Sequence, residues 1–271
     1  MKKQIRGPYA VLMTPFLGDV VDKESFIKQI KRINGTGVSG FVVNGSTAEF
    51  IHLSIEEQIE LINLVAMYKD EDMGLIVSAC TGNYVDTIAL AEHAKIVGAD
   101  AILVCPPYYF KYSAKEREEY FFKVADLSPV PVILYNVPFF TQELEIDVIY
   151  NLFKHHNIIG IKDSSANMKR IVHLISKSKG DEVSILTGTD DILTAALFAG
   201  CSGSFTAFAA IFPEKVAELY RAFNNGNYDR AKEIQEEFMS SLREADSETF
   251  PVGYKHLLER ASGIPCGNKE I

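Results

Sequence analysis

A lysine stands at the end of an apolar run over residues 158–162, and its amine could do covalent chemistry. The run is Ile-Ile-Gly-Ile-Lys, which is typical of a buried parallel strand. An ammonium partly removed from water gives up its proton more readily, and the neutral amine can attack a carbonyl to form a Schiff base. Alternation along a strand places Lys162 and Gly160 on one face, so we expect Gly160 to leave room for the amine. The alternative is a lysine that reaches solvent or pairs with Asp163.

Tyrosine and hydroxyl side chains follow other apolar runs. Tyr135 lies near the end of the run 131–136, where a phenol could relay a proton or could cap the core as a structural residue. Ser46 and Thr47 lie on a Gly-containing turn after the run 40–43, where two hydroxyls and backbone N–H groups could bind a carboxylate. Because Glu49 follows Ser46 by three residues, a helix-capping box explains the same pattern.

Two further loops carry polar or aromatic side chains. Gly188, Asp190 and Asp191 follow the run 184–187 and could receive sugar hydroxyls, although a helix N-cap would explain them equally well. Tyr108 and Tyr109 follow two prolines after the run 101–104, and adjacent tyrosines of this kind suit a site or a subunit interface.

Strand-like and helical patterns alternate along the chain and could bring these residues together. We expect strands at residues 10–14, 40–43, 75–79, 101–104, 131–136, 158–162, 184–187 and 203–205, and helices at 23–33, 54–68, 84–97, 114–125 and 190–199. Eight strands, each followed by a helix, predict an α/β fold of the (β/α)8 TIM-barrel type rather than a doubly wound open sheet. The carboxyl ends of the strands then meet at one mouth, where barrel enzymes place their sites.

Helical patterns at 212–224, 228–243 and 251–261 have no strands between them. We therefore expect a barrel over residues 1–210 and a helical C-terminal extension over residues 211–271 that packs on it. No separate linker or repeat argues for another folding unit.

Composition excludes several classes of function. The net charge of −9, with 27 basic and 36 acidic residues, disfavours binding to nucleic acid or to an anionic membrane surface, and no apolar run is long enough to span a bilayer. The apolar stretch near the N-terminus is too short for a secretory signal.

The cysteines lack metal or disulfide spacing, so we expect four buried, reduced thiols in a cytoplasmic protein and no metal. The six histidines fall on or beside predicted helices, where we expect structural or solvated roles.

Three motifs together resemble the dihydrodipicolinate synthase / N-acetylneuraminate lyase family of pyruvate-dependent class I aldolases. The resemblance runs from Gly7 through the helical extension. The segment 45–49, Gly-Ser-Thr-Ala-Glu, is similar to the family's G-[ST]-T-G-E motif, and 135–138, Tyr-Asn-Val-Pro, is similar to its Y-N-x-P motif. The segment 160–165 resembles the one that carries the Schiff-base lysine, and 200–205 resembles the eighth strand.

The resemblance implies roles for individual residues. Lys162 would form an iminium with C2 of pyruvate or another 2-oxo acid, and Tyr135 would move the protons. Ser46 and Thr47 would hold the carboxylate, and Thr47 would link Tyr135 to Tyr109 of a neighbouring subunit. A homodimer or homotetramer follows, and no cofactor is required.

The choice of aldehyde partner depends on where the chain departs from the family pattern. Phe140 occupies the place where dihydrodipicolinate synthases carry an arginine for the carboxylate of aspartate semialdehyde, and a phenyl ring does not replace a guanidinium. The positions expected to contact substrate are Ser46, Thr47, Ser164, Gly188, Asp190, Asp191 and Phe205. Ala207 replaces a serine of the sialic acid lyases. The sequence therefore favours cleavage of a 2-keto-3-deoxy sugar acid, such as 2-keto-3-deoxygluconate, to pyruvate and an aldehyde.

Three alternatives to that prediction stay open. They are condensation of pyruvate with aspartate semialdehyde by a 4-hydroxy-tetrahydrodipicolinate synthase, N-acetylneuraminate cleavage, and a catalytically silent barrel that binds a small acid. Ala48, in place of the motif's second glycine, requires that the turn there avoid a positive φ or accept strain.

Overall fold

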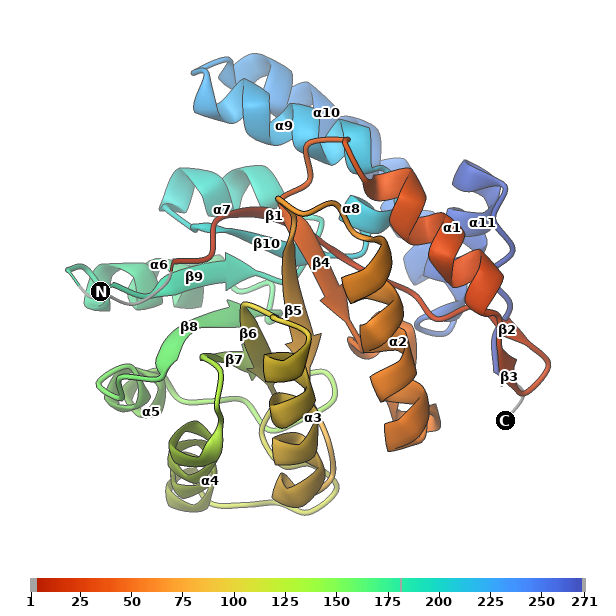
Figure 1. Ribbon diagram of the computed structural model, residues 1–271. Coiled ribbons are helices and arrows are strands. Elements are labelled where there is room, and N and C mark those ends of the chain that lie inside the picture. Colours follow the sequence, from red (N-terminus) through yellow and green to blue (C-terminus); the bar gives the residue numbers. More distant parts are fainter. Residues whose placement is uncertain (1–3, 181, 270–271) are drawn as a thin grey trace. The chain divides into compact units, whose positions relative to one another are not determined.

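A computed structural model describes residues 4–180 and 182–269. Eight parallel strands of these residues close into a barrel in the order β1-β10-β9-β8-β7-β6-β5-β4, which confirms the predicted TIM-barrel architecture (Figure 1). The strands are β1 (Gly7–Val11), β4 (Gly40–Val43), β5 (Gly74–Ser78), β6 (Ala101–Val104), β7 (Val132–Asn136), β8 (Ile158–Asp163), β9 (Ser184–Thr187) and β10 (Gly203–Thr206).

Burial on both faces explains why these short runs form strands. Every residue of β4, β6, β7, β8, β9 and β10 is buried, as expected where a parallel sheet is covered on both sides. The prediction for the first strand, 10–14, was displaced along the chain, because the strand begins at Gly7 and ends at Val11. A short antiparallel hairpin of β2 (Phe16–Leu17) and β3 (Val20–Val21) was not predicted, since two-residue strands leave no periodic signal.

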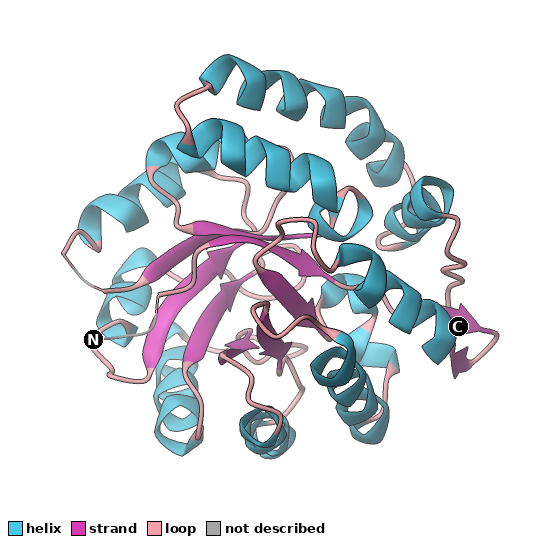
Figure 2. Ribbon diagram, turned by 45° about the horizontal axis from the view of Figure 1, so that its top comes forward, coloured by secondary structure: helices cyan, strands magenta, loops and turns pink. Residues whose placement is uncertain are grey.

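The chain divides into two compact units, which are described separately. The first contains residues 4–6, 76–180 and 182–204, with β6 to β9 and parts of β5 and β10. Its helices are α3 (Tyr84–Ile96), α4 (Ala114–Leu127), α5 (Ile146–Leu152), α6 (Met168–Lys177) and α7 (Leu193–Ala199). Each of these helices packs on its neighbour in sequence, α3 packs on β6, and α6 packs on β9. Figure 2 draws the helices in cyan and the strands in magenta.

The second unit contains residues 7–75 and 205–269, with β1, β4 and the β2–β3 hairpin. Its helical elements are α1 (Lys23–Ile33), the 3-10 turns η1 (Ser46–Ala48) and η2 (Phe50–His52), α2 (Ile55–Tyr68), α8 (Phe208–Ile211), α9 (Pro213–Asn224), α10 (Tyr228–Asp246) and α11 (Val252–Ser262). The three C-terminal helices lie where the sequence predicts them, and α10 packs on both α9 and α11. A boundary between barrel and extension after residue 210 stays a prediction.

Helix ends follow local capping chemistry. Ser54 and Glu57 form a capping box at the start of α2, and Gly200 ends α7 with a φ of 105° that only glycine adopts without strain. The predicted helix 190–199 instead begins at Leu193, with Ile192 at its N-cap.

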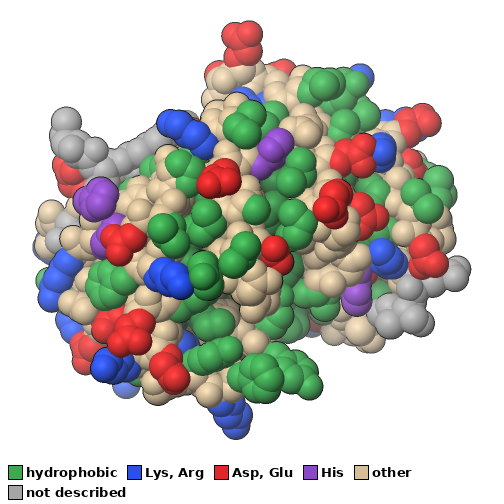
Figure 3. All heavy atoms as spheres, turned by 60° about the horizontal axis from the view of Figure 1, so that its bottom comes forward, with side chains coloured by type: hydrophobic (Ala, Val, Ile, Leu, Met, Phe, Trp, Pro, Cys, Tyr) green, Lys and Arg blue, Asp and Glu red, His purple; other side chains and the backbone are tan. Residues whose placement is uncertain are grey.

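The surface carries mixed charges. On the face drawn in Figure 3, basic side chains (blue) are scattered among acidic ones (red), and the described residues there form no continuous basic patch. None of the described helices combines the length and the apolar character that crossing a bilayer requires. The four cysteines are buried free thiols, as predicted. No group of three or more potential metal ligands occurs among residues 4–180 and 182–269.

Candidate active site

Lys162 is buried at the carboxyl end of β8 beside Tyr135 of β7. The two residues are register partners across the parallel pair, and Lys162 Nζ lies 4.4 Å from the centroid of the Tyr135 ring. Only 4% of Lys162 is exposed, so the side chain does not reach bulk solvent. Asp163 is bound to Arg170 at 2.8 Å, and no described carboxylate forms an ion pair with Lys162. Both structural alternatives for this lysine are therefore wrong.

A glycine does make room for Lys162, but it is Gly188 rather than Gly160. A Cβ added at Gly188 would lie 2.5 Å from Lys162 Cε and 1.9 Å from Ser164 Oγ. A Cβ at Gly160 would instead lie 2.3 Å from the carbonyl oxygen of Ser184, so Gly160 permits the close approach of β8 to β9. The prediction placed the space at the wrong glycine because strand alternation alone does not identify the neighbouring loop.

Ser164 and Gly188, two of the positions expected to contact substrate, thus lie beside Lys162. The hydroxyl of Ser164 is buried and has no hydrogen-bond partner in the structure. A buried hydroxyl without a partner is unfavourable, and a substrate oxygen could satisfy it. Asp190 is buried, whereas Asp191 is exposed, and neither residue is the N-cap of α7. That any of these four residues contacts a substrate stays a prediction.

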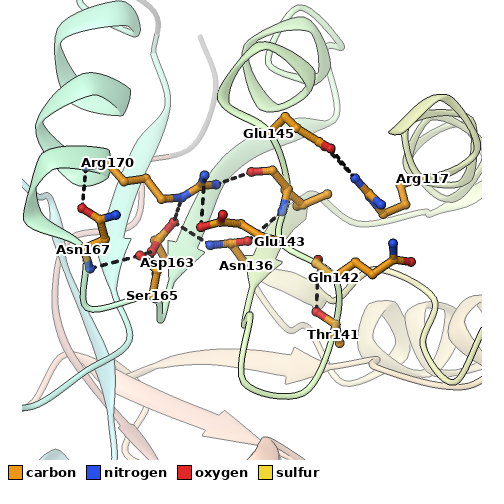
Figure 4. Close-up of polar contacts among 11 residues, drawn as sticks. Arg117, Asn136, Thr141, Gln142, Glu143, Glu145, Asp163, Ser165, Asn167 and Arg170 are labelled. Carbon is orange, nitrogen blue, oxygen red and sulfur yellow. Dashed lines mark hydrogen bonds and ion pairs between the residues drawn. The ribbon is translucent and has the colours of Figure 1, made fainter. Parts of the chain in front are cut away.

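A polar network on the opposite side of the same strands was missed by the sequence reasoning. Asp163 accepts hydrogen bonds from Arg170 Nε at 2.8 Å and from Asn136 Nδ2 at 2.9 Å (Figure 4). Asn136 follows Tyr135, and Asp163 follows Lys162. Polar residues next to both candidate catalytic residues were the available signal, because alternation sends them to the opposite face.

Two buried cysteines follow β5 and β6 in this unit. The backbone N–H of Cys105 donates to Cys80 Sγ at 3.1 Å. A hydrogen bond between the side chains of Cys105 and Cys80, together with burial, raises the pKa of Cys105 well above that of an ordinary thiol. Burial also raises the pKa of the nearby Tyr108 phenol to about 12, so this tyrosine keeps its proton at neutral pH.

The predicted carboxylate-binding turn belongs to the second unit. Thr47 is buried, and its hydroxyl has no hydrogen-bond partner in the structure. Ser46 begins η1 without capping it, and Glu49 forms a buried ion pair with Lys255 of α11, so the capping-box alternative is wrong. The left-handed residue of the turn is Glu49, with a φ of 55°, and Ala48 lies in η1 without a positive φ.

Phe205 of the second unit is fully buried against Tyr9, with ring centroids 5.1 Å apart. That Ser46, Thr47 and Phe205 contact a substrate held by Lys162 stays a prediction.

Aromatic side chains are exposed on two loops of the first unit. Tyr109 has a φ of 77°, is 92% exposed and makes an edge contact with the exposed Phe110. Phe139 and Phe140 are exposed in the loop after β7, and 55% of Phe140 is accessible. Phe140 is therefore available to a ligand or partner, but it supplies no charge.

A TIM barrel with a buried lysine at a strand end suits a Schiff-base aldolase. The sequence pattern of the Dihydrodipicolinate synthetase family matches residues 4–268. The chain therefore belongs to this family, whose members are pyruvate-dependent class I aldolases, as the motifs predicted.

Individual relatives agree with that assignment. A 4-hydroxy-tetrahydrodipicolinate synthase from Methanothrix thermoacetophila is 32% identical over 252 residues, which are 92% of this chain and 85% of the relative. The solved structure of the 4-hydroxy-tetrahydrodipicolinate synthase from Methylacidiphilum fumariolicum SolV is 26% identical with a TM-score of 0.92, covering 98% of this chain and 89% of the other. A prophage protein of the dihydrodipicolinic acid synthase family from E. coli K12, solved with pyruvate, is 29% identical with a TM-score of 0.88, covering 94% and 86%. These names support the alternative prediction of a synthase better than cleavage of a sugar acid.

Proposed function

We propose that Lys162 forms a Schiff base with pyruvate and that the resulting enamine condenses with aspartate semialdehyde, as in 4-hydroxy-tetrahydrodipicolinate synthases. The observation that carries the proposal is the buried Lys162 amine, which pairs with no carboxylate of residues 4–180 and 182–269 and lies 4.4 Å from the Tyr135 ring centroid. The names of relatives about 30% identical over nearly the whole chain support the choice of second substrate.

The chemistry requires one amine and a proton carrier. Lys162 Nζ bonds to C2 of pyruvate, the C2 oxygen leaves as water, and the protonated imine forms. Loss of a C3 proton gives the enamine, and its C3 attacks the aldehyde carbon. The amine of the semialdehyde then bonds to C2 and displaces Lys162 Nζ, which closes the ring and returns the free lysine. Tyr135 accepts and returns the protons during dehydration and condensation, a role typically worth about 10²- to 10⁴-fold in rate. Ser164, which borders the amine, binds a substrate oxygen. Binding of a carboxylate by Ser46 and Thr47 is proposed from the family resemblance alone.

Borohydride reduction in the presence of pyruvate tests the first step. The expected result is a reduced pyruvate adduct on Lys162, found by peptide mass spectrometry, with none on Lys162→Met and much slower formation on Tyr135→Phe. Labelling of other lysines alone, or an unmodified protein, would refute the proposal.

A second candidate is cleavage of a 2-keto-3-deoxy sugar acid, and Phe140 favours it. The exposed phenyl ring gives the semialdehyde carboxylate no ionic partner at this position. Condensation with aspartate semialdehyde and pyruvate release from 2-keto-3-deoxygluconate should be assayed in parallel. Phe140→Arg serves as a probe, because an added guanidinium should raise synthase activity only if the carboxylate binds there.

We further propose a cytoplasmic homodimer or homotetramer. The exposed Tyr109–Phe110 pair would seat on a neighbouring copy and carry Tyr109 to that copy's site. Four buried free thiols suit a reducing compartment. Phe110→Asp should lower the mass measured by light scattering, and an unchanged mass would contradict this interface.

A further inference from the structure

Asn136, Asp163 and Arg170 form a buried polar network at the ends of β7 and β8 (Figure 4). Neighbouring residues of a strand point to opposite faces, so Asn136 and Asp163 lie opposite Tyr135 and Lys162. Register pairs Tyr135 with Lys162 and Asn136 with Asp163. One pair therefore carries the proposed chemistry, and the next pair carries the network.

Both carboxylate oxygens of Asp163 accept hydrogen bonds. Its Oδ2 accepts from Asn136 Nδ2 and Arg170 Nε, and its Oδ1 accepts from the backbone N–H and the hydroxyl of Ser165. The carboxylate is completely buried, and its counter-charge is the Arg170 guanidinium, which is itself buried. Removing that guanidinium would leave a buried carboxylate without its compensating charge, which is strongly unfavourable.

The network also holds the loop that follows β7. Asn136 Oδ1 accepts from the N–H of Leu144 at 2.9 Å, and Arg170 donates through Nη2 to the carbonyl of Leu144. Arg170 Nη1 lies 3.5 Å from Glu143 Oε1. The N–H of Leu144 is thus bound to the end of β7 and its carbonyl to Arg170 of α6. These two bonds hold the loop that bears Phe140 at its C-terminal end.

We infer that Arg170 is a positioning residue for Lys162 and Tyr135, an inference that rests on the proposed Schiff-base function. Arg170 fixes Asp163, and one peptide bond separates Asp163 from Lys162. The carboxylate of Asp163 also accepts a hydrogen bond from Asn136, which directly follows Tyr135 in β7. A displacement of about 1 Å in a reacting group can lower a rate about a hundredfold, so a loss of this anchor acts on the reaction without contact with substrate.

Arg117 supplies a matched control in the same unit. Its side chain is equally buried and binds a main-chain carbonyl, that of Tyr112, at 2.7 Å and the carboxylate of Glu145 at 2.6 Å. Neither partner is next to Lys162 or Tyr135. Arg117→Met therefore removes a buried arginine and its ion pair while the ends of β7 and β8 keep their network.

The test compares Arg170→Met, Arg170→Lys and Arg117→Met with the parent protein. Borohydride trapping over a range of pyruvate concentrations gives the maximal trapping rate and the half-saturating concentration. Hydrogen–deuterium exchange of peptides spanning 132–137 and 158–165 reports on the strand ends without any chemistry. Should Arg170→Met not fold, the neutral pair Asp163→Asn/Arg170→Met is used, because it leaves no buried charge.

We expect Arg170→Met to lower the maximal rate by about tenfold to a hundredfold and to raise exchange in both peptides. Arg170→Lys should be intermediate, since one ammonium can pair with Asp163 but does not reproduce the guanidinium fork to Leu144. Arg117→Met should trap within about threefold of the parent. Parent-like trapping by a folded Arg170→Met, or an equal loss in Arg117→Met, would overturn the inference. If the parent itself is not trapped, the proposed function fails, and unchanged exchange in Arg170→Met would separately overturn the anchoring of the strand ends.

Discussion

Replacing Gly188 with alanine should slow Schiff-base formation on Lys162 in a protein that still folds. The new Cβ would lie 2.5 Å from Lys162 Cε and 1.9 Å from Ser164 Oγ. Carbon atoms pack favourably at about 3.5–4.0 Å, so the lysine chain must retreat by about 1 Å or more. Overpacking of this kind typically costs about 1–3 kcal/mol of stability. A displacement of about 1 Å in the attacking amine corresponds to about a hundredfold loss in rate.

The assay is the rate of borohydride-trapped pyruvate adduct on Lys162, measured with the melting temperature of each variant. Gly82→Ala is the matched control, because a Cβ there would meet only the Tyr108 hydroxyl, at 3.9 Å. The control should trap at the parent rate. A folded Gly188→Ala that also traps at the parent rate would show that the space beside Lys162 is not required, and the assignment of this lysine would lose its geometric basis.

Two other predictions concern buried charges and thiols. Glu49→Gln should destabilise the protein to urea by about 3–5 kcal/mol, because it leaves the Lys255 ammonium buried without its partner, and Glu49→Gln/Lys255→Met should recover much of the loss. A double variant no better than the single one would contradict this account. Burial raises the pKa of Cys201 and of Cys266 to about 12, so neither thiol should react with iodoacetamide at pH 8 until the protein is unfolded. Rapid labelling of native protein at either position would contradict their burial.

The barrel was predictable because its strands are short apolar runs buried on both faces. The run from residue 10 to residue 13 misplaced the first strand, since Leu12 and Met13 are buried without belonging to β1. Hydrophobic patterning identifies what is buried, and only hydrogen bonding decides where a strand ends. The β2–β3 hairpin is too short to show a period.

The candidate site shows the same distinction between what topology predicts and what depends on the detailed backbone conformation. Lys162 and Tyr135 were proposed because the strand ends of a barrel bring side chains together, which depends on topology alone, and the structure does place the two side by side. Gly188 could not be identified as the glycine beside Lys162, because the approach of a loop to a side chain depends on backbone conformation. Sequence adjacency suggested that Asp163 would pair with Lys162, although alternation already sends the two side chains to opposite faces.

That alternation gives the strand ends two separate tasks. Lys162 and Tyr135 face one way, where Ser164 and Gly188 border the amine, and Asp163 and Asn136 face the other, where Arg170 neutralises a buried carboxylate. A carboxylate that is fully hydrogen-bonded to its own arginine is not available to pair with the lysine. Asp163 therefore faces away from Lys162 and is held by Arg170, and no carboxylate among the described residues pairs with the lysine amine.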